Sequence, residues 1–441
     1  MSPVITKGLR LQERARSIIP GMTQLLSKRP DQFSLNAWPG FFSRARGVEI
    51  WDLDDNKYID MSLGGIGANV LGYADPDVDG AVKEAIERGT STSLNCPEEV
   101  ELAELLCELH PWSDMVRYAR TGGEAMAVAV RIARAHTERD KVAFCGYHGW
   151  HDWYLAANLG TENALGEHLL SGLSSSGVPK GLTGTAFPFR YNHLEELVDI
   201  ARNHGKELAA IVMEPIRNQE PEPGFLEGVR AVADETGAVF IIDEISAGFR
   251  LTSGGAHLVL GKTRPDMAVF SKALGNGYPI AAVIGKGNVM ASAQKSFISS
   301  TYWTERIGPV AAIATIRKHR NLDAAKRLMA LGGKIQEGWQ ALALKHGLPI
   351  HVSGIKPMGH FVFEAEHSQE IKAYFVQLML DQGFLASTLF YAMYAHSEKD
   401  VTAYLKAADS AFGEIAHASA KGDLRRRLRG EPAAAGFKRL T

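Results

Sequence analysis

Between residues 115 and 285, short uninterrupted apolar runs alternate with helix-like segments, and this alternation constrains the fold more than any other feature of the chain. Uninterrupted apolar strands between helices are typical of a mostly parallel sheet that is buried on both faces. We expect six such strands, at residues 115–120, 141–145, 208–215, 238–245, 266–271 and 281–285. The pattern predicts an α/β fold whose ligands bind beyond the carboxyl ends of the parallel strands.

The segments before and after this region have a different pattern of apolar and polar residues. Residues 9–19 predict a charged helix, and residues 41–61 predict a β-meander with a polar turn at Asp54-Asp55-Asn56. From about residue 311, long helical stretches are followed by a hairpin pattern at residues 351–365. We therefore expect a large α/β domain and a smaller α+β domain.

Composition excludes several classes of protein. The 441 residues carry a formal net charge of −2, whereas a polyanion-binding protein is usually basic, so we expect no nucleic-acid partner. No apolar run approaches the ~18 residues of a membrane span, and the polar start shows no secretory signal, so we expect no membrane contact. Three cysteines do not make a disulfide framework. These features favour a cytoplasmic protein.

Two local patterns imitate ligand sites and fail on inspection. The stretch from Gly255 to Thr263 resembles a nucleotide-binding phosphate loop, but Ala256 stands where the spacing requires glycine. His148 and His151 have a spacing that suits a metal, but no further ligand cluster accompanies them. We expect no metal site and no nucleotide loop.

Four features stand where predicted strands end. They are the Gly122-Gly123 turn before a helix, the aromatic ring of Tyr147, the carboxylate of Asp243 and the amine of Lys272. Each alone is weak evidence, because turn glycines, core tyrosines, loop acids and surface lysines are common. Together they match pyridoxal 5'-phosphate (PLP), which needs backbone donors for its phosphate, a flat partner for its ring, an acid at its pyridine nitrogen and a lysine for its aldehyde.

The chain as a whole resembles the class III aminotransferases of fold type I, and among them the glutamate-1-semialdehyde aminomutase-like branch. The residues that carry the resemblance extend over nearly the whole chain: Ile19-Pro20-Gly21, Trp51-Asp52, Tyr58-Ile59-Asp60, Leu71 to Pro76, Thr121 to Ala125, Tyr147 to Asp152, Met213-Glu214-Pro215, Ile242-Asp243-Glu244, Gly248-Phe249-Arg250, Ser271-Lys272 and Gly308-Pro309.

The resemblance implies two catalytic residues and a phosphate site. Lys272 is the residue that forms the Schiff base with PLP, and Asp243 pairs with the pyridine nitrogen. Gly122 and Gly123 donate backbone N–H groups to the phosphate.

Further cofactor contacts also follow from the resemblance. It implies that Tyr147 stacks on the ring with His148 beside it, that Ile245 packs on the other face, and that Glu214 belongs to the cofactor site. Thr304, rather than Thr301, reaches the phosphate of the neighbouring subunit, which implies a homodimer.

The same resemblance implies a fold type I organisation with a mostly parallel sheet of the seven-stranded type. Residues 1–75 then form an N-terminal segment that is part of the small domain and supplies dimer and active-site contacts. Residues 76–310 form the large PLP-binding domain, and residues 311–441 form the C-terminal small domain.

The implied activity is that of a PLP-dependent transaminase. It moves an amino group from an amino-acid donor to an oxo acceptor through the Lys272 Schiff base and a pyridoxamine phosphate intermediate. The alternatives that use the same parts are glutamate-1-semialdehyde 2,1-aminomutase and another PLP-dependent mutase or racemase. The small-molecule donor and acceptor stay open.

The chain departs from the aminomutase pattern where the substrate is expected. Residues 65–68 lack the branch's tryptophan, Tyr391 stands where the branch has a late glutamate, and a ring-contacting asparagine is replaced by Gln219 or shifted to Asn218. A basic residue that could meet a substrate carboxylate survives as Lys28 or Arg29. Because the cofactor motifs are kept and these positions are changed, we expect an aminotransferase with another substrate.

Overall fold

The computed structural model describes residues 6–161, 164–166 and 174–434. By its internal contacts the chain divides into two compact units, residues 76–326 (the sheet unit) and residues 1–75 with 327–441 (the terminal unit). Residues 311–326 belong to the sheet unit because helix α10 (Ile307–Asn321) packs against α2 (Pro76–Glu87) and α3 (Glu98–Leu109). The domain scheme expected from the sequence, with its boundary at 310/311, stays a prediction.

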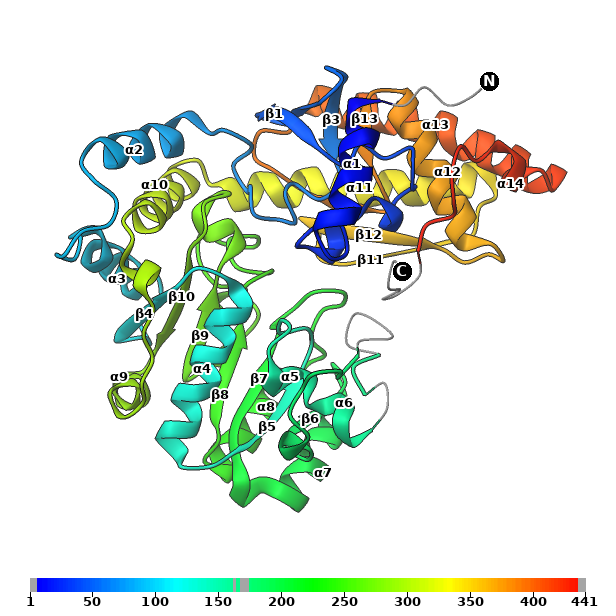
Figure 1. Cartoon of the computed structure of the whole chain (residues 1–441). Helices are drawn as coiled ribbons and strands as arrows, with labels where there is room; N and C mark the ends of the chain where they lie inside the picture. Colours follow the sequence, from blue (N-terminus) through cyan, green and yellow to red (C-terminus); the bar gives the residue numbers. More distant parts are fainter. Residues whose placement is uncertain (1–5, 162–163, 167–173, 435–441) are drawn as a thin grey trace. The chain divides into compact units, whose positions relative to one another are not determined.

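The sheet unit is built on a seven-stranded sheet (Figure 1). Five neighbouring strands are parallel, and one, β10, is antiparallel to both of its neighbours. The sheet is thus mostly parallel, as expected. In spatial order the strands are β4 (Met115–Ala119), β10 (Ala281–Gly285), β9 (Met267–Phe270), β8 (Val239–Asp243), β7 (Leu208–Met213), β5 (Lys141–Cys145) and β6 (Ala186–Pro188).

Helices cover both faces of this sheet. Alternate residues of a strand point to opposite faces, so each strand contributes to two cores. Phe144, Val212 and Ile241 share a core with α4 (Gly122–Thr137). Their neighbours Cys145, Met213 and Ile242 share a second core with residues of α7 (Leu194–His204) and α8 (Phe225–Thr236). Burial on both faces explains why these strands are apolar throughout.

The topology brings the carboxyl ends of all strands of this sheet except β10 to one edge, and five of these strands precede predicted site residues. Strands β5, β7, β8 and β9 run parallel, and β4 points the same way because β10 is antiparallel to both β4 and β9. The segments that follow these strands, starting at residues 120, 146, 214, 244 and 271, therefore emerge along the same edge. This is the edge where ligands bind in open α/β sheets. The other helices of the unit are α5 (Asp152–Leu155), α6 (Ala157–Gly160) and α9 (Gly287–Met290).

The terminal unit combines helices with two small sheets. The predicted meander is β1 (Phe42–Arg46), β2 (Glu49–Asp52) and β3 (Lys57–Met61), and β13 (Phe384–Ala386) pairs in parallel with β3. The second sheet is β11 (Ile350–Ser353), β12 (Met358–Phe363) and β14 (Leu389–Tyr391). The helices are α1 (Lys7–Ile18), α11 (Ala324–His346), which crosses the boundary between the units, α12 (Ser368–Asp381), α13 (Glu398–Lys421) and α14 (Leu424–Arg427).

Among the described residues, no helix has the length and apolar character that crossing a membrane requires. Cys96, Cys107 and Cys145 are free thiols. In the predicted meander turn, the Asp52 carboxylate accepts the backbone N–H groups of Asp54 and Asn56, which accounts for its polar residues.

Candidate active site

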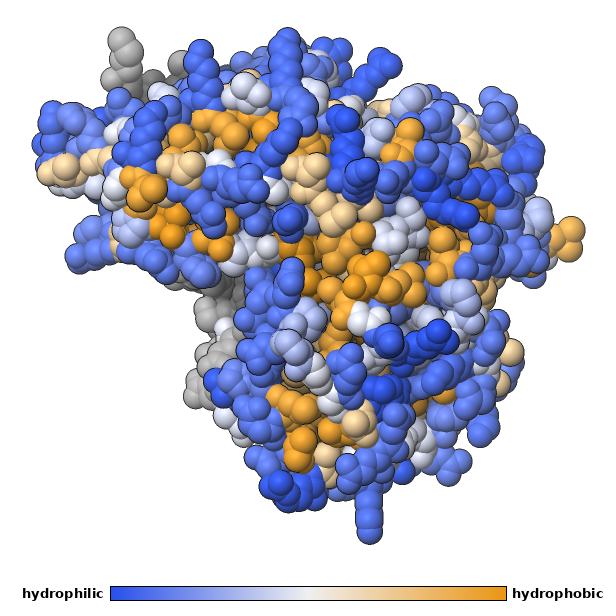
Figure 2. Space-filling model, turned by 180° about the vertical axis from the view of Figure 1, so that it is seen from behind, coloured by the Kyte–Doolittle hydropathy of each residue, from blue (hydrophilic) through white to orange (hydrophobic). Residues whose placement is uncertain are grey.

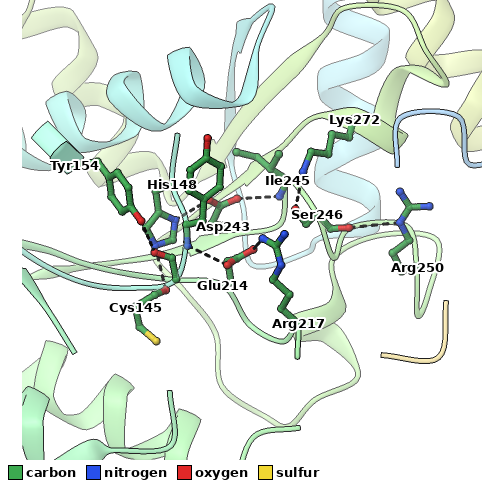
Figure 3. Close-up of polar contacts among 12 residues, drawn as sticks. Cys145, His148, Tyr154, Glu214, Arg217, Asp243, Ile245, Ser246, Arg250 and Lys272 are labelled. Atoms are coloured by element: carbon green, nitrogen blue, oxygen red, sulfur yellow. Dashed lines mark hydrogen bonds and ion pairs between the residues drawn. The ribbon is translucent and has the colours of Figure 1, made fainter. Parts of the chain in front are cut away.

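Lys272 lies two residues after the end of strand β9 and begins the short 3-10 helix Lys272–Gly275. Its φ is +47°, a left-handed value that is uncommon for a residue with a side chain. The partly buried side chain ends at the hydroxyl of Ser246, with Nζ donating to Oγ at 2.7 Å (Figure 3). Burial lowers the pKa of Lys272 to about 8, and the nearby charge of Arg217 acts in the same direction. The amine is therefore divided about equally between its neutral and protonated forms near pH 8, where a free lysine is almost fully protonated.

Asp243 ends strand β8 and is only 2% exposed. One carboxylate oxygen lies 2.8 Å from Nδ1 of His148, and the other accepts the backbone N–H of Ile245 at 3.0 Å. Burial raises the pKa of Asp243 above its ordinary value, against the opposing effect of His148. A buried carboxylate of this kind gains from a further positive partner.

The protonation of His148 follows from its second contact. Its Nε2 lies 3.1 Å from the backbone carbonyl of Cys145, and because a carbonyl oxygen only accepts, Nε2 must carry a proton. A single further proton then lies between His148 Nδ1 and Asp243. The histidine thus fixes the orientation of the carboxylate and is itself held by the end of strand β5.

Glu214 follows strand β7 and is also buried. Its Oε2 accepts the backbone N–H of Tyr147 at 3.1 Å, and its Oε1 lies 2.8 Å from Nη1 of Arg217. Burial by itself raises the pKa of Glu214, but Arg217 and the neighbouring His148 outweigh it and hold the pKa below its usual range. Gly146 is required here: its φ is +110°, and a Cβ would lie 2.7 Å from Oε2 of Glu214.

Helix α4 begins at Gly122 and Gly123, where the first N–H groups of a helix have no partner inside it. Glu124 accepts the backbone N–H groups of Arg120 and Thr121 and so fixes the turn. A Cβ on Gly122 would lie 2.9 Å from two carbons of Ile245. These two glycines therefore present bare backbone toward the same edge of the sheet.

Tyr147 and Ile245 are partly buried and pack against the core that α4 shares with the sheet. The ring of Tyr147 makes an edge contact with Tyr154, with centroids 5.9 Å apart and planes at 87°. Burial raises the pKa of Tyr147, so its phenol stays neutral over the working range of pH. Tyr147 and Ile245 therefore place apolar side chains on the segments that follow β5 and β8. The glycine turn follows β4 at the same edge of the sheet.

Eight of the nine predicted cofactor residues stand at or just after the ends of β4, β5, β7, β8 and β9, and contacts join most of them to one another. Thr304 is elsewhere: it ends the 3-10 helix Thr301–Thr304, is exposed, and donates its Oγ1 hydrogen to the carbonyl of Thr301 at 3.4 Å. Sequence reasoning missed Ser246 as the partner of Lys272 and Arg217 as the partner of Glu214. A serine or an arginine inside a loop carries no spacing signal that could have identified it.

The positions named for substrate contacts are spread over both units. Lys28 and Arg29 belong to the terminal unit, where Lys28 is exposed and Arg29 is buried and bonded to Asp31 at 2.6 Å. Residues 65–68 and Tyr391 also belong to the terminal unit. Asn218 and Gln219 lie in the sheet unit and are exposed.

The stretch that resembles a phosphate loop binds a buried carboxylate of the same chain. The backbone N–H groups of Ala256 and His257 donate to the buried carboxylate of Glu244, each at 2.9 Å. The ring of His257 donates from Nδ1 to the same carboxylate at 2.6 Å and accepts from Trp112 at Nε2. This network holds the loop that carries Ile245 and Ser246. No group of three metal-ligating side chains occurs among the described residues.

The donor set fits PLP. A turn of two glycines offers backbone N–H groups for a phosphate, a buried carboxylate oriented by His148 suits a pyridinium nitrogen, and a partly buried amine of lowered pKa suits an aldehyde. Each is held by contacts within the sheet unit.

Comparisons with known proteins agree with this chemistry. The family model of the class-III aminotransferases matches residues 34–394. The 3-aminobutyryl-CoA aminotransferase of Cloacimonas acidaminovorans (strain Evry) is 32% identical over 427 residues, covering 93% of this chain and 98% of that protein.

Solved structures give the same result. The PLP internal aldimine form of the FumI protein of Sphingopyxis sp. MTA144 is 26% identical with a TM-score of 0.85, covering 97% of this chain and 98% of that one. An omega-transaminase from Sphaerobacter thermophilus is 26% identical with a TM-score of 0.82, covering 93% and 98%. The likeness to a glutamate-1-semialdehyde aminomutase of Pseudomonas aeruginosa PAO1, at 21% identity and a TM-score of 0.77, covers 92% and 94% and shows the fold alone.

The expected fold type I architecture and PLP chemistry are therefore confirmed, whereas the aminomutase-like branch has only weak support. The chain belongs to the class III aminotransferases and is a PLP-dependent transaminase that acts on small-molecule amino donors and oxo acceptors.

Proposed function

We propose that Lys272 and Asp243 are the catalytic residues of this transaminase. The observation that carries the proposal is their placement at the ends of adjacent parallel strands, β9 and β8, with the amine and the carboxylate each held by a hydrogen bond. Lys272 binds the PLP aldehyde, and Asp243 holds the proton on the pyridine nitrogen. Gly122 and Gly123 bind the phosphate, while Tyr147 and Ile245 enclose the ring.

When bound, PLP withdraws electrons from the carbon that carries the transferred amino group. The protein supplies the proton transfers and the fixed charges. The free Lys272 amine would take the proton from that carbon and deliver it to the cofactor carbon that receives the amino group, a role that a pKa near 8 suits. His148 orients Asp243, and Glu214 holds the backbone of Tyr147 in place.

We further propose that the substrate carries its amino group in a β or ω position. A relative named for 3-aminobutyryl-CoA and a structural neighbour named as an omega-transaminase support this assignment. A screen of α-, β- and ω-amino donors against the holoenzyme tests it, with loss of the visible PLP band as the signal. Faster reaction with every α-amino acid than with its β isomer would contradict it.

A homodimer with Thr304 acting across the interface completes the proposal. Large apolar side chains in the sheet unit are largely exposed in the single chain, namely Leu94, Trp150, Phe297 and Tyr302. Figure 2 shows that hydrophobic residues reach the surface in clusters on the face it displays. Clusters of this kind favour an interaction surface, and the exposed Thr304 lies two residues after Tyr302 in the sequence.

Hybrid dimers of Lys272→Ala and Thr304→Val chains test this arrangement. If Thr304 serves the partner's site, each hybrid contains one site in which both residues are intact, and that site binds PLP with wild-type affinity. If Thr304 serves its own chain, the lysine-bearing site of the hybrid binds PLP as weakly as the Thr304→Val homodimer.

We also propose a cytoplasmic location, supported by the three free thiols and the near-neutral net charge. Cell fractionation of the tagged full chain tests it.

One experiment separates the transaminase from the aminomutase and racemase alternatives. An amino donor alone should convert the holoenzyme stoichiometrically and release an oxo product. Isomer interconversion without an oxo product would contradict the proposal.

A further inference from the structure

Two arginines add positive charge near the amine of Lys272. Arg217 and Arg250 both act against protonation of this amine, with Arg217 the stronger of the two. They belong to the loops that follow β7 and β8, in the sheet unit (Figure 3). The carboxylates of Glu214 and Asp243 act in the opposite direction. Two cations and two carboxylates thus act on the group that is expected to meet the substrate.

The two arginines differ in access. Arg250 is 1% exposed and donates from Nε to the carbonyl of Ser246 at 3.4 Å, so it is part of the protein interior. The side chain of Arg217 is 21% exposed, so a molecule that arrives from solvent can reach it. Of the two arginines, only Arg217 is both charged and accessible from solvent, so it is the one that could contact a substrate.

Arg217 is also oriented. Its Nη1 lies 2.8 Å from Oε1 of Glu214, and the other oxygen of Glu214 holds the backbone of Tyr147. A guanidinium has five N–H donors in one rigid plane. A hydrogen bond at one edge of this plane therefore fixes the directions in which the other N–H groups point. Glu214 thereby sets the direction in which Arg217 presents its charge.

We propose that Arg217 is a specificity-determining residue that binds a carboxylate of the amino donor or the oxo acceptor. The inference rests on the proposed function, because it places the reacting amino group at Lys272. It goes beyond that function by naming an anionic substrate and the residue that recognises it. A role restricted to neutralising Glu214 is the competing explanation.

Butyrate, an unreactive carboxylate, is the probe that separates these explanations. Its dissociation constant for the holoenzyme is measured by calorimetry for the wild type, Arg217→Met and Arg217→Lys. We expect Arg217→Met to weaken binding about 10- to 100-fold, as the loss of a charge-assisted hydrogen bond predicts. Arg217→Lys should fall in between, because it keeps the charge and loses the planar fork.

Arg202→Met on α7 is the matched control, since Arg202 is exposed and paired with Asp199 at 2.6 Å. It should bind butyrate as the wild type does. A second readout compares 3-aminobutyrate with its neutral amide 3-aminobutanamide in the donor half-reaction. We expect the ratio of their rate constants to fall at least tenfold in Arg217→Met.

Equal binding of butyrate by the wild type and Arg217→Met, or no binding by either, overturns the inference. Arg217→Lys keeps the test valid if Arg217→Met fails to fold. A wild-type protein in which Lys272 carries no PLP would contradict the proposed function instead. The two failures are therefore distinguishable.

Discussion

The amine of Lys272 and the hydroxyl of Ser246 are joined by a hydrogen bond of 2.7 Å. They come from the segments that follow β9 and β8, which are adjacent parallel strands. Ser246 is buried, and its loop is held by the network around Glu244. The contact therefore fixes the position of the amine relative to Asp243, three residues before Ser246.

The first prediction concerns the pH at which Lys272 reacts. Because burial lowers its pKa to about 8, the fraction of neutral, nucleophilic amine rises through pH 8 instead of pH 10.5. We expect the rate of PLP recombination with the apoenzyme to increase with pH, with a midpoint near 8 and a plateau above it. Stopped-flow absorbance measures this rate, with Nα-acetyllysine as the reference for free PLP chemistry. A rate that keeps rising through pH 10 would refute the prediction.

The second prediction concerns the charge of Asp243. Asp243→Asn keeps the shape of the side chain but removes the charge that stabilises a protonated pyridine nitrogen. We expect kcat to fall about a hundredfold or more, the scale of losing one preorganised electrostatic contact, while PLP stays bound. Asp234→Asn, at an exposed position of α8, serves as the control. A kcat within twofold of the wild type would remove Asp243 from the mechanism.

The third prediction concerns the close approach of Gly122 and Ile245. In Gly122→Ala the new Cβ lies 2.9 Å from two carbons of Ile245, so that side chain must move. We expect the dissociation constant for PLP to rise about tenfold, consistent with ~1–3 kcal/mol of overpacking. Gly80→Ala in α2, where a Cβ meets nothing within 4 Å, is the control and should leave PLP affinity unchanged. Titration of the apoenzymes followed by fluorescence decides between these outcomes.

The fourth prediction concerns stability. The Glu244 carboxylate accepts three hydrogen bonds, from the backbone of Ala256 and from the backbone and ring of His257. Glu244→Gln turns one acceptor into a donor and leaves a buried N–H without a partner. We expect the free energy of unfolding to fall by about 1–3 kcal/mol. Urea unfolding of the apoenzyme measures this, and Glu235→Gln, exposed on α8, should show no change.

Much of the sheet could be predicted because strands that are buried on both faces appear in the sequence as uninterrupted apolar runs. The runs at 141–145 and 281–285 coincide with strands β5 and β10, and the other four predicted runs match strands to within two residues at each end. Strand β6 was missed because it has three residues, ends at Pro188 and lies at the sheet edge. The antiparallel direction of β10 was also missed, since an apolar run carries no sign of direction.

The sequence could bring candidate site residues together where they stand at, or just after, the end of a buried strand. Asp243 and Lys272 are of this kind, and parallel pairing of β8 and β9 brings them to one edge. Contacts between loops were not predictable: His148 lies 95 residues from Asp243, and only the folded sheet brings them to 2.8 Å. The role of Thr304 depends on a second chain and stays a prediction.

Reductive trapping of the cofactor tests the central claim most directly. Borohydride reduction of the holoenzyme, followed by proteolysis and mass spectrometry, locates the lysine that carries PLP. We expect the phosphopyridoxyl group on the peptide that contains Lys272, its absence from Lys272→Ala, and its retention in the exposed control Lys262→Ala. The group on another lysine, or full turnover by Lys272→Ala, would contradict the account.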